Sequence, residues 1–494
     1  MNSDSRQLSR AVANLSRMTL GRAVTQVVLV ISAVVIPRTL GTEAFGRYAA
    51  LVAVVVILEA VASGGFHMAE IRFLAPLWHQ RRVEEAVALG SSIWTVRLVL
   101  SVVGGAVAAV WVAASPALGA GRALVAVVAL AVVARSGLEA TRQLFLSLDR
   151  VGHMVAFEAA RAVVLVVAAV VAFGTWGLTG VFAVVAAAVA ALAVDAWRRL
   201  RSIAPFSPRR FRWSAVRPVM GFSAMTMVGV TAWIVQAHLP VYLIAREASL
   251  VDAAVVGVTV QVYVMAQALL IAPWSALHPI LAEIESSGDS SRLREWGGVM
   301  VRWGTALSVA AALTWAFLGD LALTVLPDDF SDVHESGTIV LVAVALLGAA
   351  VSLNTLVYVG GRSVAGSASA VVFSLVTVAG TLLVVSRANG AIAPAVAWVY
   401  VGASATYFAC TYATLVCLRG MWLPLRRTLL LLAPASIAWP VLDWDASAIV
   451  RAPALIATLV VYGLVARGAG LLPRAEVERV LARLSPSEPR LDAA

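Results

Sequence analysis

Five arginines stand inside long stretches of apolar residues, where a permanent positive charge is costly: Arg22, Arg97, Arg135, Arg161 and Arg302. At the centre of a membrane-spanning helix, an arginine costs about 2.5 to 3.5 kcal/mol on insertion scales. Each of them must therefore pair with an acid, reach the membrane surface along its flexible stem, or line a water-filled cavity. A guanidinium donates two parallel hydrogen bonds and keeps its charge, so it is suited to binding a phosphate or diphosphate group.

Carboxylates accompany two of these arginines. Arg135, Glu139 and Arg142 are separated by four and then three residues, so they share one face of a helix, and Glu158 lies one helical turn before Arg161. Two interpretations remain open for this set. Glu139 and Glu158 either neutralise Arg135 and Arg161 in a structural role, or the set forms the cationic wall of a substrate cavity. These acids could also bind a coupling cation, as could Glu59 and Asp195.

Uncharged polar side chains mark the second half of the chain. Gln236 and His238 share one apolar stretch, and Gln261 lies in the next. These side chains could bond the hydroxyls of a sugar, or they could bond neighbouring helices. The candidates for the lining of a cavity are Arg22, Arg97, Arg135, Glu139, Arg142, Glu158, Arg161, Gln236, His238, Gln261 and Arg302.

Sequence motifs of enzymes are missing from the chain. It has no glycine-rich phosphate loop, no zinc-type spacing and no Gly-x-Ser-x-Gly motif. We therefore expect a protein that is not an enzyme, and we predict no catalytic residue, metal or cofactor.

The elements that must position these residues are membrane-spanning helices. The chain is 61% hydrophobic and 13% charged, whereas a soluble domain is about half apolar and about a quarter charged. Apolar stretches of about twenty residues recur, which is the length a helix needs to cross about 30 Å of hydrocarbon. The formal net charge is +10, but the basic residues lie between the apolar stretches, where they set orientation in the membrane. We therefore predict an all-α integral membrane protein and no nucleic-acid ligand.

Apolar windows predict about fourteen transmembrane helices. The predicted spans are 15–36, 45–67, 86–114, 122–146, 153–173, 178–197, 219–242, 253–281, 297–325, 337–359, 366–386, 392–417, 428–442 and 449–466. The most basic segment, 198–217, follows the sixth span and is predicted to be a cytoplasmic linker. It separates two pseudo-symmetric six-helix bundles, residues 1–197 and 218–418, as in transporters built from repeats. Residues 419–466 then form two additional transmembrane helices, and 467–494 form a cytoplasmic tail.

Two further patterns support this organisation. Most arginines fall in loops on one side of the predicted helices, which places that side and both termini in the cytoplasm of a bacterial cell, with the chain in its inner membrane. The segments 43–48 and 252–259 also match, because an acidic residue precedes a glycine, Gly46 or Gly257, at the start of the second helix of each half. This match is consistent with an internal repeat.

The segment LGTEAFGRYAALVAVVVILEAVASGGF, residues 40–66, resembles the first external loop and second helix of the polysaccharide transporter family. This family comprises the O-antigen and capsule flippases of the multidrug/oligosaccharidyl-lipid/polysaccharide exporter superfamily. Residues 144–167 are similar to the fifth helix of that family, and 251–283 to its eighth helix with the closing proline, here Pro279. Ser63 stands where the family usually has an acid.

The resemblance implies a transporter for polysaccharide biosynthesis. Such a transporter flips an undecaprenyl-diphosphate-linked oligosaccharide, for example a lipopolysaccharide O-antigen unit, to the external leaflet by alternating access. The implied partners are the lipid-linked oligosaccharide, membrane lipids, and the polysaccharide polymerase or glycosyltransferases that use the same glycan.

Three alternatives remain. A drug/cation antiporter of the same superfamily would favour an acidic cavity, which the excess of arginine opposes. A lipid II flippase would share the fold. A polysaccharide polymerase or ligase would favour a long external loop, and the predicted external loops are short.

Overall fold

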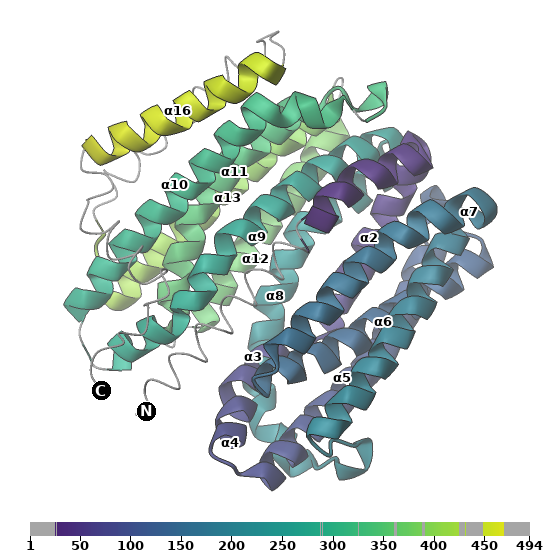
Figure 1. The fold of residues 1–494 in the computed structure, drawn as a ribbon, viewed down its shortest axis with the longest axis vertical. Helices are drawn as coiled ribbons and strands as arrows, with labels where there is room; N and C mark the ends of the chain where they lie inside the picture. Colours follow the sequence, from purple (N-terminus) through teal and green to yellow (C-terminus); the bar gives the residue numbers. More distant parts are fainter. Residues whose placement is uncertain are drawn as a thin grey trace, which may run out of the picture.

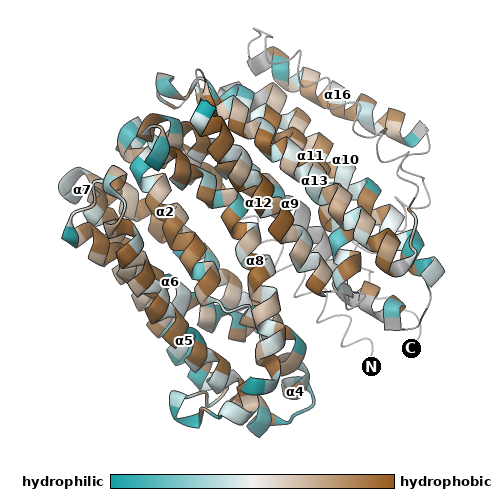
Figure 2. Cartoon of the chain, turned by 180° about the vertical axis from the view of Figure 1, so that it is seen from behind, coloured by the Kyte–Doolittle hydropathy of each residue, from teal (hydrophilic) through white to brown (hydrophobic). Residues whose placement is uncertain are grey.

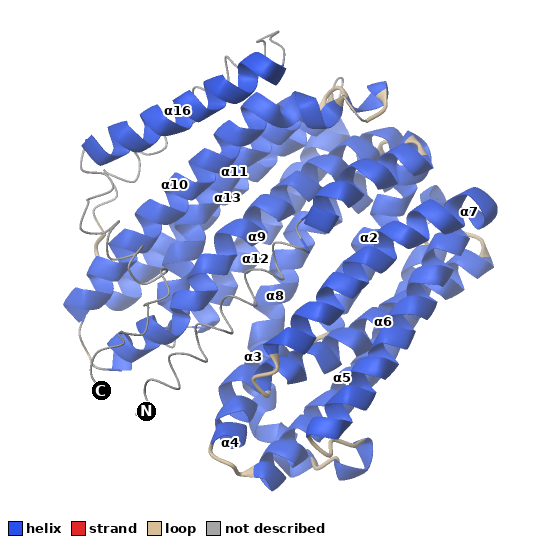
Figure 3. Ribbon diagram, viewed as in Figure 1, coloured by secondary structure: helices blue, strands red, loops and turns tan. Residues whose placement is uncertain are grey.

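The computed structural model describes residues 25, 27–286, 288, 290–324, 326–359, 363–387, 391–423, 430 and 448–468. Within these residues the chain forms helices and no strand (Figure 3). Eleven of the described helices are long and apolar enough to cross a membrane. The expectation of an all-α membrane protein is therefore confirmed.

The first group of helices contains most of the charged residues that the sequence singles out, whereas Arg302 lies in the second group. After a short apolar helix, Val27–Leu40, its long members are α2 (Thr42–Ala62), α5 (Val83–Ala113), α6 (Arg122–Ser147) and α7 (Val151–Ile203). Three short helices, α3 (Phe66–Ala69), η1 (Glu70–Leu74) and α4 (Ala75–His79), connect α2 to α5. Figure 1 shows α2, α5, α6 and α7 as one set of neighbouring helices.

Gly177 divides α7 into two membrane spans. Its backbone has φ 57° and ψ −154°, a conformation that glycine adopts readily because it has no Cβ. The residues on either side of Gly177 correspond to the predicted spans 153–173 and 178–197. The break in the helix therefore stands where the sequence places a turn.

The second group of helices follows residue 212. Its members are α8 (Trp213–Glu247), α9 (Leu250–Ser286), α10 (Ser290–Leu323), α11 (Val333–Val359), α12 (Ser363–Arg387) and α13 (Ile392–Arg419). In this group α11 packs against α10 and α13, and α8 packs against α12. A further helix, α16 (Ala448–Gly468), lies along the outside of α10 (Figure 1).

The predicted spans correspond well to these helices. Every span except 428–442 has a described counterpart, although the first, 15–36, is described only at residues 25 and 27–36. The span 428–442, apart from residue 430, and residues 469–494 lie outside the described residues. The connection between the two groups is shorter than the predicted linker 198–217, because α7 continues to Ile203 and α8 begins at Trp213. Exposed arginines such as Arg198 and Arg199 extend from the last turns of α7 into solvent, so the helix does not end where the apolar stretch ends.

The outward faces of the helices are apolar. Figure 2 shows hydrophobic residues along the outer surfaces of both groups, and large apolar side chains such as Val110, Val171 and Leu375 are strongly exposed. So much exposed apolar surface would be unstable in water, whereas it matches the hydrocarbon of a bilayer. The chain is therefore a multi-pass membrane protein.

Helix α8 contacts the first group near both of its ends. Near its start, a Cβ placed on Gly65 would lie 2.1 Å from the backbone oxygen of Ser223, so the two backbones touch there. Phe222 packs against Phe73 with the ring centroids 5.6 Å apart. Near its other end, the Tyr242 hydroxyl lies 2.6 Å from Ser115 Oγ. The helix thus belongs to the second group by sequence and also forms the surface that joins the two groups.

Candidate functional site

Three helices of the first group bring arginines and glutamates together. We call this set the charged cluster, and it consists of Glu59 on α2, Arg135, Glu139 and Arg142 on α6, and Glu158 and Arg161 on α7. These side chains are partly buried, with exposed fractions between 11% and 25% for those in ion pairs. The cluster therefore lies largely inside the protein.

Arg142 is the centre of one ion-pair network. Its Nε and Nη2 donate to the two carboxylate oxygens of Glu139 at 2.8 and 2.9 Å, and its Nη1 donates to Glu158 Oε2 at 2.6 Å. Gln143 donates a further hydrogen bond to Glu139 at 2.7 Å. One guanidinium thus holds two carboxylates, one from its own helix and one from α7.

Arg135 has a different partner. Its Nε and Nη2 contact Glu59 Oε2 at 2.8 and 2.7 Å, which links α6 to α2. The hypothesis that Glu139 neutralises Arg135 and that Glu158 neutralises Arg161 is therefore wrong, because both glutamates pair with Arg142. Helical spacing reveals only partners on the same helix, whereas Glu59 is separated from Arg135 by 76 residues in sequence.

Arg161 has no carboxylate of its own in the described part of the chain. It belongs to none of the ion pairs there, and its Nε is buried without a hydrogen-bond partner. It does interact electrostatically with Arg135, Glu59, Arg142 and Glu139. Since a buried donor without a partner costs about 1 to 3 kcal/mol, this guanidinium is poised to bind an added acceptor.

His238 joins the cluster from the second group. It lies on α8 and interacts electrostatically with Arg135 and Glu59. The structure thus brings one of the uncharged candidates to the ion pair that links α2 and α6. A ligand bound at this pair would lie within electrostatic range of a residue of the second group.

Arg97 belongs to a separate ion pair. Its Nη1 lies 3.1 Å from Glu70 Oε1 of η1, and the two side chains are 1% and 0% exposed. Burial raises the pKa of the Glu70 carboxyl to about 7, although the neighbouring Arg97 guanidinium opposes this rise. Such complete burial excludes Arg97 from a solvent-filled cavity in this state, so its role here is structural.

The remaining candidates lie elsewhere. Gln236 is fully buried where α8, α9 and α13 meet: it accepts a hydrogen bond from Tyr263 at 3.4 Å, and Tyr400 donates to its backbone oxygen at 3.0 Å. Gln261 lies on α9 with a buried Oε1, and Arg302 is buried in α10. Arg22 lies outside the described residues.

The predicted cavity set omits Glu59, which completes the cluster. The signal for it in the sequence is an acid inside an apolar stretch, which costs free energy unless a partner is nearby. That signal identifies the residue as a candidate for pairing but does not identify its partner.

The two groups meet tightly at the end of the bundle that is poor in arginine. We call this end, which contains the starts of α2 and α9, the arginine-poor end, and the opposite end, which contains 204–212, the arginine-rich end. A Cβ on Gly46 would lie 1.8 Å from the backbone oxygen of Leu250. A Cβ on Gly257 would lie 3.1 Å from the Cβ of Ala49. The two glycines that match in the sequence thus face one crossing, that of α2 with α9.

Polar and aromatic contacts reinforce this closure. Thr42 Oγ1 donates to Asp329 Oδ2 at 2.6 Å, and the ring centroids of Phe45 and Phe330 are 6.2 Å apart. Both contacts join α2 to the turn before α11. In this state the groups are therefore sealed together at the arginine-poor end.

Comparison with known proteins gives both a family and a fold. The family model described as "Polysaccharide biosynthesis protein" matches residues 11–285. No curated protein sequence matches the chain significantly.

Solved structures resemble the fold over nearly the whole chain. One is the lipid II flippase MurJ in an inward closed conformation, with TM-score 0.65 and 10% identity, covering 94% of this chain and 99% of the other. Another is a multidrug resistance MATE family transporter of the MOP superfamily in an inward-facing conformation, with TM-score 0.63 and 10% identity, covering 86% and 99%. A third is the MATE multidrug transporter DinF-BH in complex with R6G, with TM-score 0.62 and 18% identity, covering 82% and 95%. At these identities the matches establish a shared fold.

Proposed function

Because the chain belongs to the polysaccharide biosynthesis protein family, we propose that it moves an undecaprenyl-diphosphate-linked oligosaccharide across the bacterial inner membrane by alternating access. The charged cluster binds the diphosphate, the lipid tail stays in the bilayer, and no covalent bond is made or broken. The glycan is a building block of a surface polysaccharide such as O-antigen or capsule. The glycosyltransferases that assemble it and the polymerase that consumes it act before and after this step.

The observation that carries this proposal is the environment of the Arg161 side chain. It is a partly buried cation whose Nε is buried without a partner, and it interacts electrostatically with both members of the Arg135–Glu59 pair. Diphosphate oxygens would accept hydrogen bonds from Arg161 and compete with Glu59 for Arg135. The three arginines and three glutamates of the cluster balance in formal charge, so what favours the diphosphate is the donor that Arg161 leaves free, because Arg161 has no carboxylate of its own among the described ion pairs.

The position of the cluster suits a substrate that enters from the cytoplasm. At 1.5 Å per residue, Arg135 lies about 20 Å along α6 from its start at the arginine-poor end. This is the middle of the 26-residue helix, and Arg142 on α6 and Glu158 and Arg161 near the start of α7 lie nearer the arginine-rich end, which the positive-inside rule places in the cytoplasm. The contacts at Gly46 and Thr42 then close the external side while the substrate binds.

Substitution of Arg161 tests this proposal. In cells that depend on the protein for export, Arg161→Ala should abolish export of the glycan while the protein remains folded in the membrane. Arg161→Lys should retain part of the export, because lysine supplies a cation without the two-pronged donor geometry. Export is measured as surface polysaccharide, and folding as membrane level and thermal unfolding of the purified protein.

A matched control comes from the exposed pair Arg82 and Glu85, whose closest atoms are 2.6 Å apart. The double variant Arg82→Ala with Glu85→Ala removes an ion pair of similar geometry outside the cluster, and it should export normally. Normal export by Arg161→Ala at normal membrane level would refute the proposed diphosphate site.

A further inference from the structure

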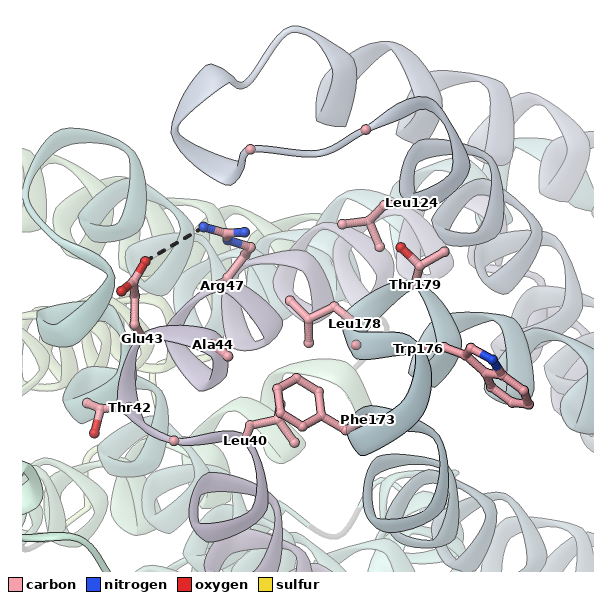
Figure 4. Close-up of a pocket in the computed structure, with 14 residues that line it drawn as sticks. Leu40, Thr42, Glu43, Ala44, Arg47, Leu124, Phe173, Trp176, Leu178 and Thr179 are labelled. Atoms are coloured by element: carbon pink, nitrogen blue, oxygen red, sulfur yellow. Dashed lines mark ion pairs between the residues drawn. The ribbon is translucent and has the colours of Figure 1, made fainter.

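A pocket opens at the arginine-poor end of the first group (Figure 4). Its volume is about 670 Å³, which lies within the usual range of about 300 to 1,000 Å³ for small-ligand sites. It is enclosed by the start of α2, the connection between α5 and α6, and the break in α7 at Gly177. We call it the outer pocket.

The outer pocket is lined by both donors and acceptors. Arg47 Nη2 lies 3.7 Å from Glu43 Oε1 on the same wall (Figure 4). The Arg47 Nε is buried and has no hydrogen-bond partner among the described residues. Thr179 adds a hydroxyl from the second span of α7. The charges of Glu43 and Arg47 balance, so the lining offers hydrogen bonds without a net charge.

Apolar side chains form the other walls. Figure 4 shows the ring of Phe173 and the side chain of Leu40 on the side away from Arg47, with Leu124 on a third side. The ring of Trp176 points away from Phe173, at the rim, and is 68% exposed. A ring surface beside paired donors and acceptors suits a ligand that has both hydroxyl groups and apolar C–H faces.

From this lining we propose that the outer pocket is a carbohydrate-binding subsite that holds a sugar of the glycan as it leaves the protein. The inference rests on the proposed function, since it assumes that a glycan is carried. A sugar fits because it is uncharged, carries hydroxyl groups for Glu43 and Arg47, and can lay one face on Phe173. A phosphate fits less well, because Glu43 already neutralises Arg47 and would repel an anion.

The pocket is separate from the charged cluster and adjoins the closure. Glu43 and Glu59 are both on α2, about 24 Å apart along its axis at 1.5 Å per residue. Thr42, which lines the pocket, also donates to Asp329 in the seal between the groups. A sugar in the outer pocket is therefore placed to contact the helix end that must move when this side opens.

Cysteine protection tests the proposal. In a background with Cys410→Ser and Cys417→Ser, Thr179→Cys is labelled in whole cells with a membrane-impermeant maleimide. The native bacterium, which makes its own lipid-linked glycan, is compared with a strain that lacks the first glycosyltransferase of that glycan. Labelling of Thr179→Cys should be at least three-fold slower when the glycan is made. The control Ala117→Cys, which is exposed on the same end and outside the pocket lining, should label equally in both strains.

The outcomes separate this inference from the proposed function. Equal labelling of Thr179→Cys in both strains, while Arg161→Ala still blocks export, would overturn the outer pocket and leave the transport proposal standing. Normal export by Arg161→Ala would instead contradict the diphosphate site.

Discussion

At the scale of single residues, the charged cluster shows how charged side chains are stabilised inside an apolar protein. A buried guanidinium and its carboxylate stabilise each other as a pair, whereas removal of one partner leaves an uncompensated buried charge. The side chain of Glu59 is 13% exposed and that of Arg135 is 11% exposed, so the charge of each is compensated mainly by the other. The same pair stands next to His238 of the second group.

This arrangement predicts the behaviour of variants of the Arg135–Glu59 pair. Arg135→Ala should lower the free energy of unfolding by about 3 kcal/mol, because Glu59 is left without its partner. The double variant Arg135→Ala with Glu59→Ala should recover most of that loss. Export should remain abolished in the double variant, since the cation for the diphosphate is missing. Thermal unfolding and surface polysaccharide are the two readouts, and normal export by the stable double variant would show that the pair is only structural.

A second prediction concerns Glu70, whose pKa is raised to about 7 by burial, above its ordinary value of 4.5. The folded protein therefore holds the Glu70 proton more tightly than the unfolded chain. This contribution to stability is fully present below about pH 4.5 and is lost as the pH rises through 7.

Glu70→Gln cannot ionise, so its stability should not show this loss. The difference in midpoint of thermal unfolding, wild type minus Glu70→Gln, should therefore fall between pH 5 and pH 8. A difference that stays constant over this range would contradict the raised pKa.

The residues of the cluster could be predicted from the sequence better than their contacts. Charges inside apolar stretches are conspicuous, so Arg135, Glu139, Arg142, Glu158 and Arg161 are all found from the sequence. Their partners depend on how α2, α6 and α7 rotate about their axes, and periodicity within one helix contains no information on this. The pairing of Arg135 with Glu59 therefore needs the structure.

At the scale of helices, the crossing of α2 with α9 depends on glycine. The absence of a Cβ at Gly46 lets the backbone of Leu250 approach, and Gly257 faces Ala49 at the same crossing. The matching segments 43–48 and 252–259 are thus in contact as well as similar. The sequence shows the similarity, but only the packed helices show that the two segments meet.

Alanine substitutions at glycines should therefore have graded effects. Gly46→Ala forces α2 and α9 apart, because its Cβ would lie 1.8 Å from a backbone oxygen. Gly257→Ala should be milder, because its nearest contact is a side-chain carbon at 3.1 Å. Gly152→Ala is the control, since nothing lies within 4 Å of its added Cβ.

Accessibility of a buried position on α9 measures this opening. Thr259→Cys, in the same Cys410→Ser and Cys417→Ser background, is buried in the sealed state and should resist external maleimide. Labelling should increase strongly with Gly46→Ala, slightly with Gly257→Ala, and not with Gly152→Ala. Equal protection in all three variants would show that this crossing is not the seal.

At the scale of the whole molecule, the distribution of arginine predicts the orientation in the membrane. The connection at 204–212 and the turn before α11 lie at opposite ends of the bundle. The sequence predicts these positions because each apolar stretch is one membrane crossing. The number of crossings between two loops then decides whether they lie on the same side. It predicts helix ends less well, since arginine side chains let α7 and α8 extend beyond the membrane.

Labelling from outside the cell checks the orientation. In the same Cys410→Ser and Cys417→Ser background, Ser331→Cys should react with an impermeant maleimide, whereas Arg209→Cys should react only after the membrane is permeabilised. Both positions are exposed in the structure, so burial does not limit either reaction. Reaction of both from outside would refute the predicted number of crossings between them.

Helix α8 constrains how the two groups can move. It touches the first group near both ends, through Ser223 and Tyr242, and packs against α12 of the second group between them. Sliding of one group past the other along α8 would break all these contacts at once, so we expect α8 to resist it. Rotation of one group about the axis of α8 would preserve most of these contacts. We therefore predict that the two groups turn about the axis of α8 and separate at the crossing of α2 with α9.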